Sequence, residues 1–298
     1  MSGFLAHSLL LLVAFIWGVT FVFQTTGMET LGPFSFTWAR FMFGSIALLP
    51  FALMESRQVS LFRQCRASRK ICWLALGLGL AMFCGSALQQ ISLGITSVAN
   101  AAFFTTLYVP LVPLLGLFLF RRQPGMLIWL AVAVFVLGSW LMSGASPRSA
   151  RLGDLLVIIG AVFWAFHIMI VGRLGRLSQA PIQMAFVQTV MTAFFALPLM
   201  LALEQPKFAD FTPALPELLI AGVLSTALAF GLQLFAQRYS SNAAAALLLS
   251  LEGVFAALAA WLLIDQMMTV IAVIGAGLIV GAVLMVEWES IHRTSSGE

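Results

Sequence analysis

The chain of 298 residues is 61% hydrophobic and only 9% charged, whereas an ordinary soluble domain is about 25% charged. With a mean hydropathy of +1.04 it has too little polar surface for a water-soluble globule. The formal charge of +4 comes without a basic run interleaved with aromatic residues, so nothing indicates nucleic-acid binding. The three cysteines show neither CxxC nor Cys/His spacing. We therefore expect no disulfide framework, no metal site and no other cofactor.

Ten apolar segments are long enough to cross a bilayer as helices, which takes about 20 residues with a range of about 17–25. The first is long for the apolar part of a signal peptide and has no small-residue cleavage site after it, so we count it as a membrane helix. The chain is thus predicted to be an all-α integral membrane protein. The predicted spans are Leu9–Thr26, Phe34–Met54, Ile71–Ile91, Val98–Phe120, Gly125–Met142, Leu155–Val171, Ile182–Ala202, Leu218–Ala236, Ala243–Ile264 and Thr269–Val286.

Basic residues gather in alternate loops. If both termini face the cytoplasm, eleven of the 15 Lys and Arg residues lie in inside loops, which is the bias that the positive-inside rule predicts. We therefore predict a multi-pass protein with both termini in the cytoplasm. The inside residues would be Arg57, Arg63, Arg66, Arg69, Lys70, Arg121, Arg122, Arg173, Arg176, Arg238 and Arg293, and the outside ones Arg148, Arg151 and Lys207.

The two halves of the chain resemble each other. Trp17 in the first span matches Trp164 in the sixth, and Gln90 in the third matches Gln233 in the eighth. Because each half has an odd number of helices, the second half must enter the membrane from the opposite side, an arrangement that suits alternating access. The sequence predicts a first five-helix repeat at residues 1–143, a periplasmic linker at 144–153, a second, inverted repeat at 154–288 and a cytoplasmic tail at 289–298.

Three motifs are similar to those of a known family. They are Trp17-Gly18, Trp38-Ala39-Arg40-Phe41, and Leu251-Glu252-Gly253-Val254-Phe255-Ala256 ahead of Asp265. With the two five-helix halves, they resemble the drug/metabolite transporter superfamily, EamA type, over nearly the whole chain. That family commonly has Leu-Glu-Pro where this chain has Gly253, and Glu where it has Asp265. The resemblance implies a bacterial inner-membrane exporter of amino acids or similar metabolites.

Two charged residues lie within predicted helices, where such groups are costly and need a reason. Glu252 lies near the middle of the ninth helix. It would bind a substrate amine or carry a proton, or it would be a neutral group hydrogen-bonded to neighbouring helices. Arg40 lies about two turns from the outer end of the second helix. It would face a substrate carboxylate or Glu252, or extend its long stem to the interface.

Aromatic and neutral polar residues complete the candidate substrate path. Trp17 and Trp164 lie mid-helix, whereas membrane tryptophans favour the headgroup belts. These two side chains would line a central pocket or simply pack between helices. His167 lies on the face of Trp164 and would relay protons, although a lone His more often only packs. The remaining candidates, which would line the path or join helices by hydrogen bonds, are Gln24, Gln90, Asn100, Tyr108 and Gln233.

Two further patterns bear on helix geometry. Pro110 and Pro113 interrupt the fourth helix, where unwound backbone would expose carbonyls to a cavity. Gly277 and Gly281 in the tenth helix have the spacing that allows close helix contact. We expect this close contact to join two helices of the same chain. A contact between two copies of the chain is the second possibility.

These observations predict a secondary carrier with one central site between the halves. It would be an exporter of small metabolites such as amino acids or related amphipathic solutes, with an uptake permease or facilitator as the alternative. An intramembrane enzyme would need a cluster such as HExxH or Gly-x-Ser-x-Gly, and neither occurs. No GxxxxGK[ST] loop occurs, so ATP would not drive the carrier directly. The expected partners are a small solute and the lipid bilayer, with the chain as monomer or homodimer.

Overall fold

The computed structural model describes residues 3–96, 98–121, 124–142 and 152–295. No strand occurs in these ranges. Among the described residues, eight helices are long and apolar enough to span a membrane, and two shorter apolar helices cover Met126–Met142 and Val270–Val286. The predicted all-α membrane class is confirmed, and the eight long helices with the two shorter ones agree with the ten predicted spans.

The elements follow the predicted spans closely. Two short 3-10 helices (η1 and η4) and two π-helical stretches (η2 and η3) extend or join the α-helices. In chain order the elements are α1 (Gly3–Thr26), η1 (Gly27–Glu29), α2 (Pro33–Gln58), α3 (Leu61–Ala67), α4 (Arg69–Leu93), α5 (Val98–Thr105), α6 (Tyr108–Phe120), α7 (Met126–Met142), α8 (Leu152–Leu177), α9 (Pro181–Leu199), η2 (Met200–Glu204), α10 (Phe208–Phe211), α11 (Leu215–Leu219), η3 (Ile220–Ala229), α12 (Phe230–Ala236), η4 (Gln237–Tyr239), α13 (Asn242–Leu249), α14 (Leu251–Ile264) and α15 (Val270–Ser295).

Several helices extend beyond their predicted spans, and α8 and α15 do so by the most residues. α8 extends beyond Leu155–Val171 at both ends, and α15 continues past Val286 to Ser295. No Gly or Pro occurs between Val286 and Ser295, so nothing there stops the helix, and much of the tail predicted at 289–298 is helical. Most of the linker predicted at 144–153 lies outside the described residues, as do Arg122, Arg148 and Arg151.

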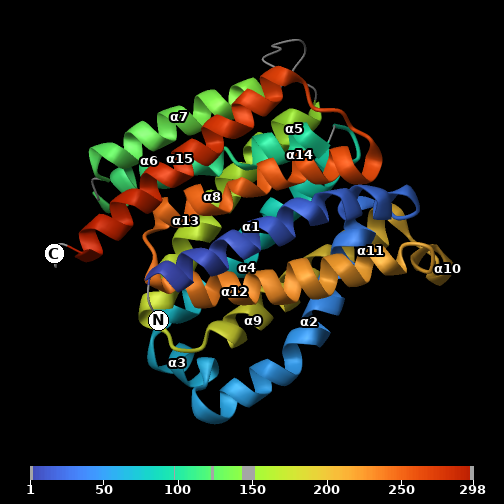
Figure 1. The fold of residues 1–298 in the computed structure, drawn as a ribbon. Helices are drawn as coiled ribbons and strands as arrows, with labels where there is room; N and C mark the ends of the chain where they lie inside the picture. Colours follow the sequence, from blue (N-terminus) through green and yellow to red (C-terminus); the bar gives the residue numbers. More distant parts are fainter. Residues whose placement is uncertain (1–2, 97, 122–123, 143–151, 296–298) are drawn as a thin grey trace.

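The spanning helices run roughly side by side (Figure 1). α7 and α15 lie together along one edge of the bundle, and α2 lies at the opposite edge. Between them, α1 packs against α14 and η3, α4 packs against α8, and α2 packs against α9. The start of α1 and the end of α15 lie at the same end of the bundle (Figure 1), as an even number of crossings requires.

The fourth predicted span is broken between α5 and α6, a few residues before the prolines that were expected to interrupt it. Pro110 explains the position of the break. It has no N–H to donate to the carbonyl of Thr106, and its ring clashes with that carbonyl in a continuous helix. The Thr106 carbonyl instead accepts from Val109 N at 2.9 Å. Pro110 therefore lies in the first turn of a new helix, where the chain tolerates it.

The ninth predicted span is broken at the equivalent place, between α13 and α14. The spacing that aligns Gln90 with Gln233 also aligns Pro110 with Gly253. At this second break Gly253 N donates to the carbonyl of Ser250 at 3.1 Å. α14 packs against α5, and α13 packs against α6. The two breaks consequently face each other inside the bundle, where neither is exposed to lipid.

A glycine lets α1 approach α14 closely, next to the break between α13 and α14. A Cβ on Gly18 would lie 2.4 Å from Phe255 Cβ and 2.7 Å from the carbonyl oxygen of Glu252. No larger residue fits there without moving α14. Gly18 thus sets the depth at which Glu252 lies against α1.

The contact between α7 and α15 also depends on glycine, though not on the pair that the spacing pattern suggested. A Cβ on Gly275 would lie 2.4 Å from the carbonyl oxygen of Gly138. By contrast, Cβ atoms on Gly277 and Gly281 would meet nothing within 4 Å. The expectation that Gly277 and Gly281 make a close contact within the chain is wrong, because they lie on a different face of α15.

Two glutamates tie the α2–α9 pair together at both ends. Glu204, at the end of η2, accepts from Phe34 N at 2.8 Å and from Ser35 N at 2.7 Å at the start of α2. Glu55, near the end of α2, accepts from Ile182 N at 3.2 Å and Gln183 N at 2.8 Å at the start of α9. Each carboxylate satisfies N–H groups that the helix itself leaves unpaired, and it lies at the positive end of the helix dipole.

We predict that Glu55→Ala and Glu204→Ala each destabilise the protein. Hydrogen bonds to a charged group contribute about 1.5–3 kcal/mol, and partial solvent exposure reduces this to about 1–2 kcal/mol. The melting temperature in mild detergent should fall by about 2–8 °C for each variant. Glu29→Ala, which removes an exposed carboxylate from η1, is the matched control. Equal melting temperatures for all three variants would contradict the role of the two caps.

Candidate substrate site

A small internal cavity lies where the two helix breaks meet the neighbouring helices. Its volume is about 40 Å³, which is enough for water, since one water needs about 10–15 Å³. It is far below the roughly 300–1,000 Å³ of typical pockets for small ligands. Its lining comes from both halves of the chain: Trp17, Phe21, Gln24, Arg40, Gln89, Thr105, Tyr108, Trp164, His167, Ile168, Ser225, Phe230, Gln233 and Glu252.

Tyr108 and Glu252 join the two breaks across the cavity. Tyr108 is the first residue of α6, and Glu252 lies in the first turn of α14. Both side chains are buried, and Tyr108 Oη donates to Glu252 Oε1 at 3.0 Å. The position of Glu252 at a helix start also places its carboxyl group near the positive end of the α14 dipole.

Arg40 enters the same cavity from α2. Its guanidinium donates to Gln24 Oε1 of α1, and its Cζ lies 4.8 Å from the centre of the Phe41 ring. Arg40 is 3% exposed, so it does not reach the membrane interface. Its buried Nε has no hydrogen-bond partner among the described residues, and no ion pair joins it to Glu252. The cavity thus holds a basic and an acidic group that are kept apart.

Three aromatic rings form one wall of the cavity. Phe230 lies between the two tryptophans, with its ring centre 4.7 Å from that of Trp17 and 6.2 Å from that of Trp164. The tryptophans are fixed by hydrogen bonds, because Trp17 Nε1 donates to the carbonyl of Ser225 at 3.2 Å and Trp164 Nε1 donates to Gln89 Oε1 at 3.1 Å. The wall is consequently rigid and apolar, with its polar edges already satisfied.

His167 and Gln233 are held by neighbouring amides. His167 Nε2 lies 2.9 Å from Gln188 Oε1, and its ring packs edge-on against Trp164. Gln233 Nε2 donates to Gln237 Oε1 at 3.1 Å, whereas Gln233 Oε1 has no partner among the described residues. Gln233 Oε1 is therefore a buried acceptor without a partner among the described residues, beside the cavity. His167 packs against the aromatic wall, as a lone histidine usually does.

Eight of the ten residues proposed from the sequence line this cavity, and the exceptions are Gln90 and Asn100. Gln90 turns away, donating to the carbonyl of Gln24 at 3.2 Å and to Met28 Sδ. Asn100 lies on α5 outside the lining. Binding of a substrate by the lining residues stays a prediction.

Sequence reasoning missed six lining residues, which are Phe21, Gln89, Thr105, Ile168, Ser225 and Phe230. Gln89 was missed because its neighbour Gln90 matches Gln233 in the repeat, although adjacent helical residues point about 100° apart. Phe230 is one of 26 phenylalanines, and no spacing distinguishes it. Only its position between the two predicted tryptophans in space identifies it.

A bundle of spanning helices with a buried polar cavity at paired helix breaks is the architecture of a membrane transporter. The model of the EamA-like transporter family matches residues 4–144 and 151–288, one match in each half. The chain belongs to this family, and the resemblance noted in the sequence is confirmed. The family points to a transporter rather than an enzyme.

Similar proteins agree with this assignment. An uncharacterized transporter of Archaeoglobus fulgidus is 30% identical over 93% of this chain and 84% of its own length. The uncharacterized inner membrane transporter YedA of Escherichia coli K12 is 29% identical over 51% of this chain and 48% of its own length. A protein of known crystal structure superposes with a TM-score of 0.76 at 17% identity, covering 96% of this chain and 98% of the other, which supports the fold alone.

We predict that the Tyr108–Glu252 hydrogen bond is energetically coupled. Tyr108→Phe leaves a buried carboxyl oxygen without its donor, which costs about 1–3 kcal/mol and lowers the melting temperature. Glu252→Gln also lowers it, but the double variant should lose less than the sum of the two single losses, because the shared interaction is removed only once. Tyr108→Phe combined with Glu29→Gln serves as the control and should be additive. Additivity in both pairs would refute the coupling.

Proposed function

We propose that the protein is a secondary carrier that exports small zwitterionic metabolites, such as amino acids or related amphipathic solutes, by alternating access of two inverted halves. The observation that supports this most strongly is the presence of Arg40 and Glu252 in one buried cavity without an ion pair between them. Burying two separated ionisable groups is costly. A zwitterionic ligand that contacts both would offset that cost.

The binding mode follows from the groups at the cavity. The ligand carboxylate would accept from Arg40, whose buried Nε has no other partner among the described residues. Its ammonium group would donate to Glu252 and, once the cavity widens, to the buried and unpartnered Gln233 Oε1. An apolar side chain would pack against the wall formed by Trp17, Trp164 and Phe230.

Transport requires the cavity to widen, since about 40 Å³ does not hold an amino acid. The paired breaks between α5 and α6 and between α13 and α14 supply places where one half of each helix can move relative to the other. Opening at one end of the bundle and then at the other would carry the solute across. A permease that takes solute up, or a facilitator without coupling, would use the same site, so direction is decided by experiment.

We predict that wild-type protein expressed in bacteria enriches one class of zwitterionic metabolite in the medium, as measured by untargeted mass spectrometry. Glu252→Gln and Arg40→Gln should each reduce this enrichment by about 10-fold or more, because each removes a charge-assisted contact of about 1.5–3 kcal/mol. Glu29→Gln, which changes an exposed carboxylate, should export like wild type.

Membrane levels of every variant must be equal for the comparison. Enrichment that survives both cavity substitutions would refute the site. Depletion of a solute from the medium by wild type alone would replace export with uptake. A loss of transport only in variants that also fail to reach the membrane would refute the proposed binding roles.

We also propose that the protein lies in the bacterial inner membrane with both termini in the cytoplasm. The supporting observation is that α3, which carries Arg63 and Arg66, lies at the same end of the bundle as the start of α1 (Figure 1). The uneven distribution of basic residues supports a cytoplasmic location for that end.

This orientation predicts the labelling of Cys65 in a Cys72→Ser/Cys84→Ser background. A membrane-impermeant maleimide should modify Cys65 in inside-out vesicles and leave it unmodified in intact spheroplasts. Maleimide reacts with the thiolate, and burial raises the pKa of the Cys65 thiol, so the labelling rate should rise as the pH increases through and above the ordinary value. Labelling in intact spheroplasts would reverse the orientation.

A further inference from the structure

Two buried glutamines join neighbouring helices on opposite sides of the central cavity. Gln90 Nε2 of α4 donates to the carbonyl of Gln24 in α1 at 3.2 Å, and we call this bond the first latch. Gln237 Nε2 of η4 donates to the carbonyl of Ile168 in α8 at 2.7 Å, and we call this bond the second latch. Both donors are 0% exposed. Both carbonyls belong to residues that line the cavity, so each latch ties a part of the cavity wall to an adjacent helix.

The two latches occupy equivalent places in the repeat. The spacing that aligns Trp17 with Trp164 aligns Gln90 with Gln237. Each latch joins the first spanning helix of one half, which is α1 or α8, to the third spanning helix of the same half. In both, a side-chain amide donates to a main-chain carbonyl. A bond that recurs in both halves suits a role that two inverted halves would exchange.

The latches lie toward opposite ends of the bundle. The end of α4 meets the start of α8, where Ser92 Oγ donates to the carbonyl of Gly153 at 2.8 Å. The first latch lies toward this end, because Gln90 and Gln24 are in the last turns of α4 and α1. The start of α1 and the end of α8 lie together at the other end, which we call the N-terminal end. The second latch lies toward the N-terminal end, because Gln237 follows α12 as the first residue of η4.

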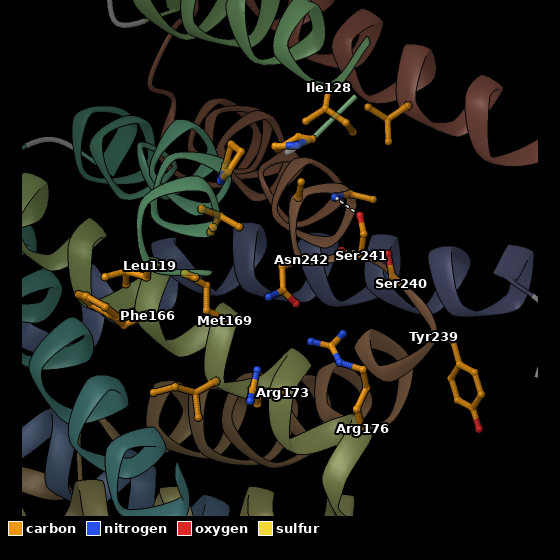
Figure 2. A pocket seen from close by; sticks show the side chains of 18 of the residues that line it. Leu119, Ile128, Phe166, Met169, Arg173, Arg176, Tyr239, Ser240, Ser241 and Asn242 are labelled. Atoms are coloured by element: carbon orange, nitrogen blue, oxygen red, sulfur yellow. Dashed lines mark hydrogen bonds between the residues drawn. The ribbon is translucent and has the colours of Figure 1, made fainter. Parts of the chain in front are cut away.

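A larger pocket lies next to the central cavity at the N-terminal end. Its volume is about 470 Å³, within the range of about 300–1,000 Å³ typical of pockets for small ligands. Figure 2 shows Met169 of α8 and Ser240, which follows η4, at this pocket. Ile168, the residue before Met169, lines the central cavity instead, and among the described residues the two spaces share none of their lining. The second latch therefore lies at the part of α8 that separates them.

Breaking a latch is favourable only when water reaches it. A buried amide that loses its partner carries the full cost of its desolvation, whereas a hydrated amide does not. Water enters when the wall of the cavity separates toward one end of the bundle. Each latch should consequently break together with the opening of a path to its own end, and it should hold while that path is closed.

We propose that Gln90 and Gln237 are the gate residues of the carrier. The second latch closes the central cavity toward the N-terminal end, and the first latch closes it toward the opposite end. Release of one latch while the other holds opens the cavity to one end alone. This inference rests on the proposed function, because it assigns residues to the two openings that alternating access requires.

The test places a single reporter thiol in the central cavity and needs no substrate. Ser225→Cys, at a residue of the cavity lining, is combined with serine in place of Cys65, Cys72 and Cys84, which are the three cysteines of the chain. A membrane-impermeant methanethiosulfonate reagent is applied to intact spheroplasts and, separately, to inside-out vesicles. The labelling rate from each side measures how often the cavity opens to that side. The Cys65 labelling described above identifies which side the N-terminal end faces.

Each latch variant should open one side only. Gln237→Leu should raise the labelling rate about two- to ten-fold from the side of the N-terminal end, and Gln90→Leu should do so from the opposite side. This range is the net effect of one intramolecular hydrogen bond on the open population. Gln188→Leu is the matched control, because it removes an equally buried amide that binds His167 rather than a main-chain carbonyl. It should favour neither side.

A second pair of variants replaces any leucine variant that does not reach the membrane. Gln90→Asn and Gln237→Asn keep the amide but are one carbon shorter, so they should change the rates in the same directions. Unchanged rates in both latch variants, a rise from both sides in either one, or the same one-sided rise in Gln188→Leu would overturn the proposal. One-sided rises in a protein that moves no metabolite would support the gates and refute the carrier alone.

Discussion

Backbone groups at a helix break cannot be left facing lipid, and much of this structure follows from that constraint. Nothing in the hydrocarbon replaces a lost hydrogen bond, so an interrupted helix must turn its break toward protein or a polar cavity. The described part of the chain has two such breaks at equivalent places and turns them toward each other. The polar side chains then gather at the same depth, because that is the one region already separated from lipid. Tyr108 and Glu252 are first-turn residues of the two resumed helices, and they meet there.

The need to satisfy unpaired backbone N–H groups also explains how α2 and α9 are joined. α2 and α9 are joined at opposite ends by Glu204 and Glu55, so neither end of that pair opens without breaking charged hydrogen bonds. Gly18 brings α14 against α1 with almost no clearance. A carrier built in this way would keep α2 and α9 together as one body. The discontinuous helices, whose halves are joined by only one or two residues, would supply the movement.

The sequence specified the class, the ten spans and most of the cavity lining for one reason. In lipid, polar residues are rare enough that each of them carries information, and Trp17, Arg40 and Glu252 stood out against an apolar background. Apolar residues that line the cavity could not be recognised from the sequence for the same reason. Phe230 lies at the centre of the aromatic wall, yet nothing in the chain distinguishes it from phenylalanines that face lipid. The second limit was the rotation of a helix about its axis, which the sequence does not give to within one residue. The repeat pointed to Gln90, whereas its neighbour Gln89 lines the cavity.

The central cavity makes demands on a ligand that bear on selectivity. It holds Arg40 and Glu252 within about 40 Å³, and a simple anion there would leave the carboxyl group of Glu252 buried and unmatched. Only a ligand with both charges would satisfy Arg40 and Glu252 together. Discrimination would therefore arise at the inner cavity, where desolvation is complete and each unpaired group is most costly.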